Sequence, residues 1–458
     1  MTAETAAVAL TLLGALAPIG FFAMVSIPSL ANRPLGEAAT AALSKLCFGA
    51  GLASLLGAWL ALELTPQPRL VVELGEWFRC GSYAFHLSLL ADRLSLPFAA
   101  FALALCGVVA SFSHRYLHRE PGYNRFFAML ALFAAGITLV ILAGSIELVF
   151  AGWELVGVSS ALLVAFFHER PLPVRNGLRT FVVYRTTDVG LVAAAVLLHH
   201  ALGTGEFGAF VGSESWPGGS SPLGSGTATA VALLLWLSAM GKCAQIPFSG
   251  WLPRAMEGPT PSSAIFYGAL SVHAGAYLML RVAPLLDRSP VAAASLVALG
   301  GATALHATCV GRVQSDIKSA LAYASLTQVG IILAEIGLGL RWIAVAHILG
   351  HASVRSLQFL RAPSLLHDLH QVESAVGGHL ARTGLHLERA VAGGLQRRLY
   401  RMALDRWRLD EALDCLVVEP FLAIFRRLDA LDRRWCRIVA GAGSRSPSSH
   451  VRRRRAGG

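Results

Sequence analysis

The fold of this chain is decided by residues 241–261, which read GKCAQIPFSGWLPRAMEGPTP. This stretch follows an apolar run from Ala228 to Met240 that leads deep into a lipid bilayer. A lysine at that depth costs roughly 3 kcal/mol or more unless it is paired or faces water. Pro247 breaks or kinks the helix, and broken backbone at membrane depth survives only inside protein or beside a water-filled cavity. The stretch therefore predicts a transport site at Lys242. The alternative is a helix end at the membrane surface with a snorkelling lysine.

The composition is that of a membrane protein. Of 458 residues, 55% are hydrophobic and 14% charged, and the mean hydropathy is +0.59. Soluble globular chains have about a quarter of their residues charged. The seven cysteines have no paired spacing, so we expect neither a disulfide framework nor a metal, and no cofactor. The net charge of +11 lies mostly in the last quarter of the chain, where anionic lipid or an acidic protein suits it better than nucleic acid.

Apolar segments of about 20 residues can cross a bilayer, and they recur along most of the chain. We predict an all-α, polytopic membrane protein of about eleven transmembrane helices, the seventh of them broken near 242–250. Residues 64–93 are expected to form an extramembrane hairpin, and residues 201–227, rich in Gly and Ser, a flexible loop. The predicted spans are 6–27, 41–63, 94–113, 124–144, 147–167, 179–200, 228–250, 262–283, 291–310, 316–338 and 342–361.

This pattern divides the chain into four parts. Residues 1–93 hold the N-terminal helices and the hairpin, and residues 94–362 form the transmembrane core. Residues 363–440 alternate apolar and charged positions, which is typical of amphipathic helices that lie on the membrane or against a soluble partner. Residues 441–458 form a basic tail that we expect to be disordered.

Basic residues in the short loops predict the orientation in the cell inner membrane, with the N-terminus periplasmic and the C-terminus cytoplasmic. The strongest signal comes from two loops with three arginines each on the predicted inner side. These are Arg115, Arg119 and Arg125, and then Arg170, Arg175 and Arg179.

Glu154 is the carboxylate that stands out within the predicted spans, because the residues on both sides of it are apolar. Alone in such surroundings it would take up a proton, whereas a nearby lysine would hold it ionised. A pair of Glu154 and Lys242, each affecting the other's protonation, is the minimal element of a proton relay. A static ion pair that ties two helices together is the alternative.

A second group of polar residues lies in the last predicted span. His347, His351 and Arg355 recur every four residues and so share one helix face. Neutral histidine both donates and accepts a proton and titrates near physiological pH. Metal binding lacks a neighbouring carboxylate or cysteine ligand, and buried histidines that only hydrogen-bond neighbouring helices are the main alternative. Structural or interfacial positions are expected for His273, His306 and Glu335.

Four motifs in order resemble the antiporter-like subunits of respiratory complex I and of multisubunit sodium/proton antiporters. They are GWELVG at 152–157, the Lys242 stretch, DIKSALAYAS at 316–325 and the His347-x-x-x-His351 pair. The resemblance covers about residues 90–360. It implies an antiporter-like inverted-repeat fold and a non-catalytic membrane subunit that conducts protons or Na⁺.

The resemblance also implies roles for individual residues. Glu154 matches the essential glutamate of the family, Lys242 its broken-helix lysine, and Asp188 the acidic residue that modulates this pair. The central relay of the family, which leads toward a second half-channel, corresponds here to Lys318, His347 and His351.

The sequence departs from the family in two places. The histidine after the Pro-Thr-Pro turn falls at Tyr267, while a histidine stands at His273, and both are candidates for a modulating role. The relay lysine falls at Arg355. Since arginine does not release its proton in proteins, Arg355 can gate or pair but cannot carry a proton.

No further span is predicted after about residue 361, so we expect a truncated second repeat without a second broken helix. Together with IFYG at 265–268, LRAPSLLHD at 360–368 and the basic C-terminal region, this resembles a narrower group. That group is the membrane subunit of the DAB two-subunit inorganic-carbon accumulation system. It implies a cytoplasmic, zinc-binding, carbonic-anhydrase-like partner. Inward flow of protons or Na⁺ through the membrane subunit is then expected to drive the conversion of carbon dioxide to bicarbonate by that partner.

Two other functions remain open at this point. The chain could be a subunit of a cation/proton antiporter or of a complex I-like NADH-quinone oxidoreductase. It could also be a structural platform for assembly whose relay is inactive, which Arg355 favours. The sequence does not distinguish protons from sodium.

Overall fold

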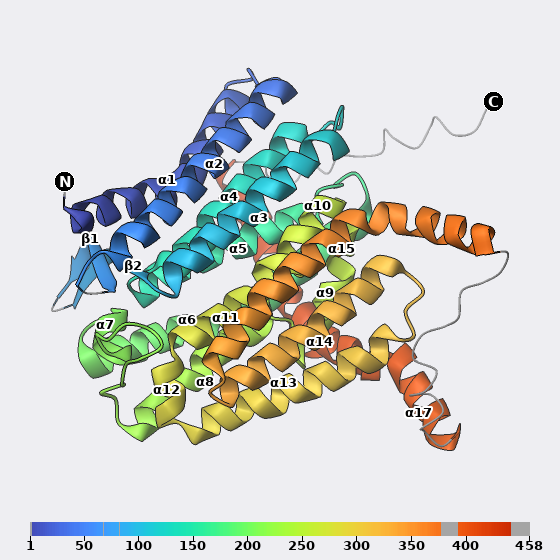
Figure 1. Cartoon of the computed structure of the whole chain (residues 1–458). Coiled ribbons are helices and arrows are strands. Elements are labelled where there is room, and N and C mark those ends of the chain that lie inside the picture. The colour runs from blue at the N-terminus through green and yellow to red at the C-terminus, as the bar shows by residue number, and fades with distance from the viewer. Residues whose placement is uncertain (1, 67, 82, 377–392, 441–458) are drawn as a thin grey trace. The chain divides into compact units, whose positions relative to one another are not determined.

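The computed structural model describes residues 2–66, 68–81, 83–376 and 393–440, and this part of the chain is mostly helical (Figure 1). Nine of the described helices are long and apolar enough to cross a membrane. They are α1 (Ala3–Leu30), α2 (Glu37–Glu63), α3 (Ser95–Tyr116), α4 (Tyr123–Leu142), α5 (Ile146–Val164), α6 (Pro171–Leu202), the continuous segment Thr260–Arg281, α13 (Pro290–Gly311) and α14 (Ile317–Gly337).

The two remaining predicted spans also form helices, but they are less apolar. They are α8 (Ser225–Lys242) and α15 (Arg341–Val376), which carry the lysine and the histidines. The prediction of an all-α membrane fold is therefore confirmed. Two boundaries differ clearly: α6 begins at Pro171, before its predicted start at residue 179, and α15 continues past Pro363 to Val376, beyond its predicted end at residue 361.

The predicted break after Lys242 is present. Only short turns of helix follow α8, namely η1 (Phe248–Gly250), α9 (Trp251–Arg254) and η2 (Ala255–Glu257). The chain then resumes as α10 (Thr260–Ser263), a π-helical stretch η3 (Ala264–Ala269) and α11 (Ser271–Arg281), followed by the short α12 (Ala283–Arg288). π-Helical turns inside α-helices are rare and frequently mark functional sites.

The predicted hairpin is present and lies within residues 64–93. β1 (Arg69–Cys80) pairs antiparallel with β2 (Tyr83–Asp92). Residues 201–227, predicted to be a flexible loop, contain the short helix α7 (Phe207–Val211). Trp216 in this segment is buried and donates its indole N–H to the carbonyl of Leu280 at 3.2 Å. Its aromatic residues anchor it to the helices, and its Gly and Ser content does not reveal this.

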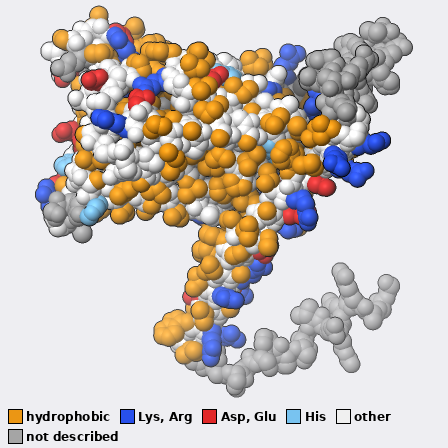
Figure 2. Space-filling model, turned by 90° about the horizontal axis from the view of Figure 1, so that it is seen from below, with side chains coloured by type: hydrophobic (Ala, Val, Ile, Leu, Met, Phe, Trp, Pro, Cys, Tyr) orange, Lys and Arg blue, Asp and Glu red, His pale blue; other side chains and the backbone are white. Residues whose placement is uncertain are grey.

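Close packing between neighbouring helices supports the transmembrane core. A Cβ atom on Gly152 of α5 would lie 2.7 Å from the carbonyl oxygen of Gly136 of α4, so these helices approach as closely as backbones allow. Small residues allow such contacts in membranes, where helix association relies on van der Waals packing. Hydrophobic side chains cover much of the outer face in view (Figure 2).

One buried ion pair ties the hairpin to the core. Arg281 at the end of α11 donates from Nη1 to Asp92 Oδ2 at 2.5 Å and from Nη2 to Asp92 Oδ1 at 3.1 Å. Burial alone would raise the pKa of Asp92, but Arg281 and the backbone N–H groups of Ser95 and Leu94 together lower it below its ordinary value. The stabilisation by Asp92 is therefore present at neutral pH and declines as the pH falls toward the folded pKa.

Substitution of Asp92 by Asn leaves the Arg281 guanidinium buried without a carboxylate. We expect the free energy of unfolding to fall by about 3–5 kcal/mol, measured as a lower thermal midpoint in detergent. The neighbouring pair Arg93–Glu63, at 2.9 Å and exposed, is a matched control, and Arg93→Gln should cost less than about 1 kcal/mol. Equal losses for the two variants would contradict the structural role of Asp92.

The chain divides into two compact units, Met1–Asp410 and Glu411–Gly458, and the C-terminal region contributes to both. The first unit includes α17 (Gly393–Leu404), which contacts α13, and η4 (Arg406–Arg408). Helix α18 (Leu409–Leu413) precedes η5 (Asp414–Val418) and α19 (Glu419–Val439). As predicted for 363–440, α19 is amphipathic, with an exposed apolar row that includes Phe425, Leu428, Leu431, Trp435 and Ile438. The predicted disordered tail at 441–458 lies outside the described residues.

Candidate functional site

Lys242 is the last residue of α8, and its side chain is completely buried. Its Nζ atom has no hydrogen-bond partner in the described chain and lies 3.9 Å from Asp188 Oδ2. The ammonium also lies 4.0 Å from the ring centroid of Tyr184 and 5.2 Å from that of Trp153. Aromatic faces attract a cation more strongly when water is excluded. The site thus holds a buried amine with one carboxylate at contact distance.

The broken backbone keeps Lys242 in this position. The indole N–H of Trp251, in α9, donates to the carbonyl of Gly241 at 2.9 Å, and the Trp251 ring packs edge-on against Tyr184 at 5.0 Å. A Cβ on Gly157 would lie 2.8 Å from Lys242 Nζ, so the absence of a side chain at Gly157 lets the ammonium lie against the backbone of α5. The residues after the break therefore fold back to support the end of α8.

Asp188 of α6 is the centre of this site. Its Oδ1 accepts from Trp153 Nε1 at 2.6 Å and from Ser238 Oγ at 3.2 Å, and its Oδ2 accepts from Arg185 Nη2 at 2.8 Å. Both carboxylate oxygens of Asp188 thus accept hydrogen bonds. The resemblance assigned Asp188 a modulating role, and in the structure it is the carboxylate that contacts Lys242.

Arg185, one turn before Asp188, joins the site to Glu154. Its Nη1 forms an ion pair with Glu154 Oε2, while its Nη2 binds Asp188. The predicted coupling of Glu154 and Lys242 stays a prediction, and in the structure Arg185 and Asp188 lie between the two residues. The order is Glu154, Arg185, Asp188 and Lys242, which we call the buried charge chain.

The buried charge chain balances two carboxylates against two cations when all four groups are ionised. Such a chain is sensitive to any proton gained or lost, since an unpaired charge in a low-dielectric interior is strongly unfavourable. Glu154 Oε1 is buried and has no hydrogen-bond partner in the described chain, which leaves that atom able to accept a proton. Of the two cations only Lys242 can release one.

A second group of polar residues joins α11 to α15. His273 Nε2 lies 3.0 Å from His351 Nδ1, and Arg355 Nε donates to His351 Nε2 at 3.3 Å. The His347 ring lies 6.4 Å from that of His351, and His347 Nδ1 lies 2.9 Å from Glu335 Oε1. The predicted shared face of His347, His351 and Arg355 is confirmed.

Two residues that the sequence places in structural or interfacial positions belong to this group, which we call the histidine chain. Helices α11 and α15 pack together and bring the His273 ring to His351. The tight turn between α14 and α15 places Glu335 beside His347. Both contacts arise between helices, and the sequence carries no local signal for them.

Hydrogen bonding assigns the protons in most of the histidine chain. His273 Nδ1 faces the carbonyl of Ala269 at 2.5 Å and must donate there, so its Nε2 accepts from His351 Nδ1–H. His351 Nε2 then accepts from Arg355. Both rings are neutral in this arrangement.

His347 differs from the other two rings. Its Nδ1 faces Glu335, and its Nε2 lies 3.0 Å from Gln328 Oε1. Two acceptors suit an imidazolium, which donates at both nitrogens, and a rotated Gln328 amide suits the neutral ring. His347 therefore has a polar partner at each ring nitrogen, one of them a carboxylate.

Buried hydroxyl groups gather around Tyr184, whose ring lies against Lys242. The Tyr184 hydroxyl lies close to the side chain of Ser271, and the buried Tyr267 hydroxyl has no hydrogen-bond partner within the described residues. Tyr267 and Ser271 are four residues apart on the segment that carries His273, and the Tyr267 ring packs on Trp251 at 5.6 Å. Buried polar groups of this kind are commonly satisfied by internal water.

Lys318 is the predicted relay residue that the structure does not bring to either chain. It lies half-buried in the first turn of α14, whose N-terminus is capped by Asp316 Oδ2 accepting from the Ser319 N–H at 2.7 Å. Its side chain forms no ion pair with any described residue. The role of Lys318 stays a prediction.

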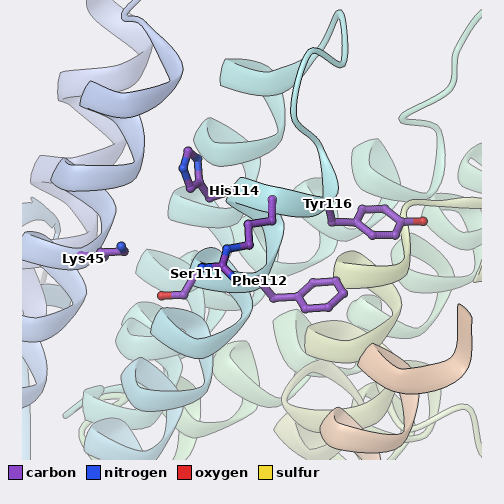
Figure 3. A pocket seen from close by; sticks show the side chains of 6 residues that line it. Lys45, Ser111, Phe112, His114 and Tyr116 are labelled. Atoms are coloured by element: carbon purple, nitrogen blue, oxygen red, sulfur yellow. The ribbon is translucent and has the colours of Figure 1, made fainter. Parts of the chain in front are cut away.

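Two cavities differ in their relation to these chains. The larger, of about 810 Å³, is an open groove of α2 and α3 (Figure 3), and none of its lining residues contacts the buried charges. The smaller, of about 250 Å³, lies among α13, α14 and α15 and is lined by Arg355 and Gln328. The smaller cavity thus reaches Arg355 and the Gln328 side chain that lies beside His347. The larger one is lined by Lys45, Ser111, Phe112, His114, Arg115 and Tyr116.

The broken helix, the buried charge chain and the histidine chain together define a polytopic membrane protein of the antiporter-like class. Residues 143–378 match the family described as NADH:quinone oxidoreductase/Mrp antiporter, TM, and the chain belongs to it. Residues 77–127 match the family described as NADH-ubiquinone oxidoreductase (complex I), chain 5 N-terminus. The predicted membership of the complex I and Mrp antiporter-like family is confirmed.

Individual relatives agree with this family. NAD(P)H-quinone oxidoreductase chain 5 of Synechocystis is 32% identical over 65% of this chain and 44% of its own length. NADH-quinone oxidoreductase subunit L of Mycobacterium tuberculosis is 34% identical over 64% of this chain and 46% of its own. A chain of the Mrp complex from Dietzia sp. DQ12-45-1b superposes with a TM-score of 0.61 and 28% identity, over 78% of this chain and 37% of its own. The chain spans less than half the length of these relatives.

Proposed function

We propose that this chain is a proton-translocating, antiporter-like subunit of a multi-subunit membrane complex of the complex I or Mrp type. The observation that carries the proposal is the buried charge chain, which ends on a lysine at a broken helix and has a histidine chain beyond it. Relatives whose names assign them to such complexes support it.

In this proposal the buried charge chain stores the proton and the histidine chain passes it on. A proton entering at Glu154 weakens its pairing with Arg185, so that Arg185 pairs more strongly with Asp188 and the hold of Asp188 on Lys242 weakens. Lys242 then releases its proton toward the hydroxyls of Tyr184, Tyr267 and Ser271. Water bound at these hydroxyls would link Lys242 to His273.

The neutral rings of His273 and His351 can transfer a proton by exchanging donor and acceptor roles. Arg355 remains charged and fixes the orientation of His351 rather than carrying the proton. His347 and Glu335 form the last exchangeable pair, next to the smaller cavity. We propose also that the N-terminus is periplasmic and the C-terminus cytoplasmic, as the arginine loops favour.

The test is proton uptake into lipid vesicles that contain the chain with its co-purifying subunits. A potassium gradient with valinomycin supplies a membrane potential that is negative inside the vesicles, and a trapped dye reports the internal pH. We expect acidification that occurs without Na⁺. Uptake that requires Na⁺ would point to sodium coupling, and no uptake above protein-free vesicles would contradict the proposal.

A second candidate is the membrane subunit of a two-subunit inorganic-carbon system. It is favoured by the resemblance of residues 265–268 and 360–368 and by the exposed apolar row of α19, which suits a soluble partner. A mild-detergent pull-down with metal analysis separates the two. One large zinc-carrying soluble partner, lost on deletion of residues 364–458, would favour the carbon system. Several membrane subunits without zinc would favour the complex I or Mrp type.

A further inference from the structure

A buried carboxylate outside the transmembrane helices contacts the segment that follows the helix break. Asp410 is 7% exposed, and its Oδ2 accepts from Arg254 Nη2 of α9 at 3.0 Å and from Arg406 Nη1 at 3.0 Å. Its backbone carbonyl accepts from Arg179 Nη2 of α6 at 3.2 Å. Three guanidinium groups from three separate segments thus converge on one residue near the end of the first unit.

The fit around Asp410 is tight. An added Cβ on Gly250 of η1 would overlap Asp410 Oδ1, so the carboxylate lies directly against the backbone of η1. Glycine at position 250 permits this approach of the Asp410 carboxylate because it has no Cβ atom. The contact is therefore steric as well as electrostatic.

The turn that delivers Asp410 is strained. Arg406, Trp407 and Arg408 have positive φ values of 50°, 56° and 55°, which non-glycine residues adopt only where their surroundings enforce it. The Trp407 ring lies edge-on against His306 of α13 at 5.4 Å. Ion pairs at Asp410 and the ring at Trp407 hold this turn against the helical body.

A short series of contacts connects Asp410 to Lys242. Gly250 is followed directly by Trp251, whose indole N–H holds the carbonyl of Gly241 at 2.9 Å. The same indole packs on Tyr184, whose ring lies 4.0 Å from Lys242 Nζ. A displacement of η1 therefore moves the residues that position the lysine.

We propose that Asp410 is a positioning residue for proton transfer, which holds the segment after the helix break in the geometry that Lys242 requires. Through it the turn at residues 406–410 acts on the buried charge chain, and a partner bound to that turn gains a mechanical connection to the lysine. This inference rests on the proposed function, since it assigns Asp410 a part in the same proton path.

The test compares Asp410→Asn and Gly250→Ala in the full chain with its co-purifying subunits. The first removes the charge, and the second displaces the carboxylate while leaving every charge in place. We expect both to lower proton uptake roughly tenfold, because small misplacements of reacting groups have effects of this size. Asp410→Glu should restore part of the loss. The matched controls are Asp405→Asn, an exposed aspartate five residues away, and Gly301→Ala, an open position in α13.

Two readouts separate positioning from general stability. The pH at half-maximal uptake should shift by about half a unit or more in both variants, whereas simple loss of folded protein lowers the amplitude alone. Hydrogen exchange of the amides in residues 248–257 should also become faster than in the controls.

The outcomes distinguish this inference from the function on which it rests. Wild-type uptake, pH midpoint and exchange in Gly250→Ala would overturn the positioning role while leaving the proton path intact. If Asp410→Asn does not accumulate, Gly250→Ala decides alone. If the wild type conducts no protons, the proposed function fails, and unchanged exchange at 248–257 would then overturn the contact between Asp410 and the break as well.

Discussion

Replacing Lys242 by Ala is expected to reduce proton uptake about 100-fold or more, to the level of the background leak. Lys242 is the only member of the buried charge chain whose cation can release a proton, and its Nζ lies 3.9 Å from Asp188. The sharper variant is Lys242→Arg. It keeps the positive charge beside Asp188 but cannot give up a proton, so we expect it to be as inactive as Lys242→Ala.

The control for Lys242 is Lys45→Ala, an exposed lysine in the groove of α2 and α3. This variant should conduct normally, and all three proteins should assemble with the same subunits. Substantial uptake by Lys242→Arg would mean that a fixed charge suffices there. Loss of uptake together with loss of assembly would indicate a structural role and return weight to the platform hypothesis.

The helices were predictable because each depends on a local property of the sequence. Runs of about 20 apolar residues set the spans, and Pro247 with Lys242 set the break. The hairpin followed from two short strand-like stretches, Arg69 to Val72 and Ala84 to Leu90. None of these predictions needs knowledge of which helices lie side by side.

The contacts within the site were less predictable, because they are made between helices. The sequence identified Glu154, Asp188 and Lys242, but it did not reveal that Arg185 separates Glu154 from Lys242. The spacing of Arg185 and Asp188, three residues apart on α6, was the available signal, since such pairs lie on one helix face. No comparable signal exists for the contact between His273 and His351, 78 residues apart.

The same reason explains why Asp410 could not be found from the sequence. It lies in a region whose composition predicts only an amphipathic, exposed surface, and its partners come from α6, α9 and η4. The steric fit with Gly250 depends on a backbone approach that no residue pattern encodes. A region that reads as a peripheral surface thus includes one buried charge.

The position of Arg185 leads to a second large effect. If Glu154 acts on Lys242 only through Arg185, then Glu154→Gln and Arg185→Gln should each lower proton uptake roughly tenfold, and the double variant should be no worse than Arg185→Gln alone. The reason is that Glu154, once it has lost its guanidinium partner, is held in apolar surroundings and takes up a proton, which makes it equivalent to Gln.

A direct action of Glu154 on Lys242 predicts a different result. The two losses would then multiply, and the double variant would fall about 100-fold. The matched control is Arg175→Gln, an exposed arginine on the same helix, which should conduct normally. Multiplied losses would therefore contradict the order of the buried charge chain. Equal proton uptake by the double variant and by Arg185→Gln would mean that protonation of Glu154 affects Lys242 through Arg185.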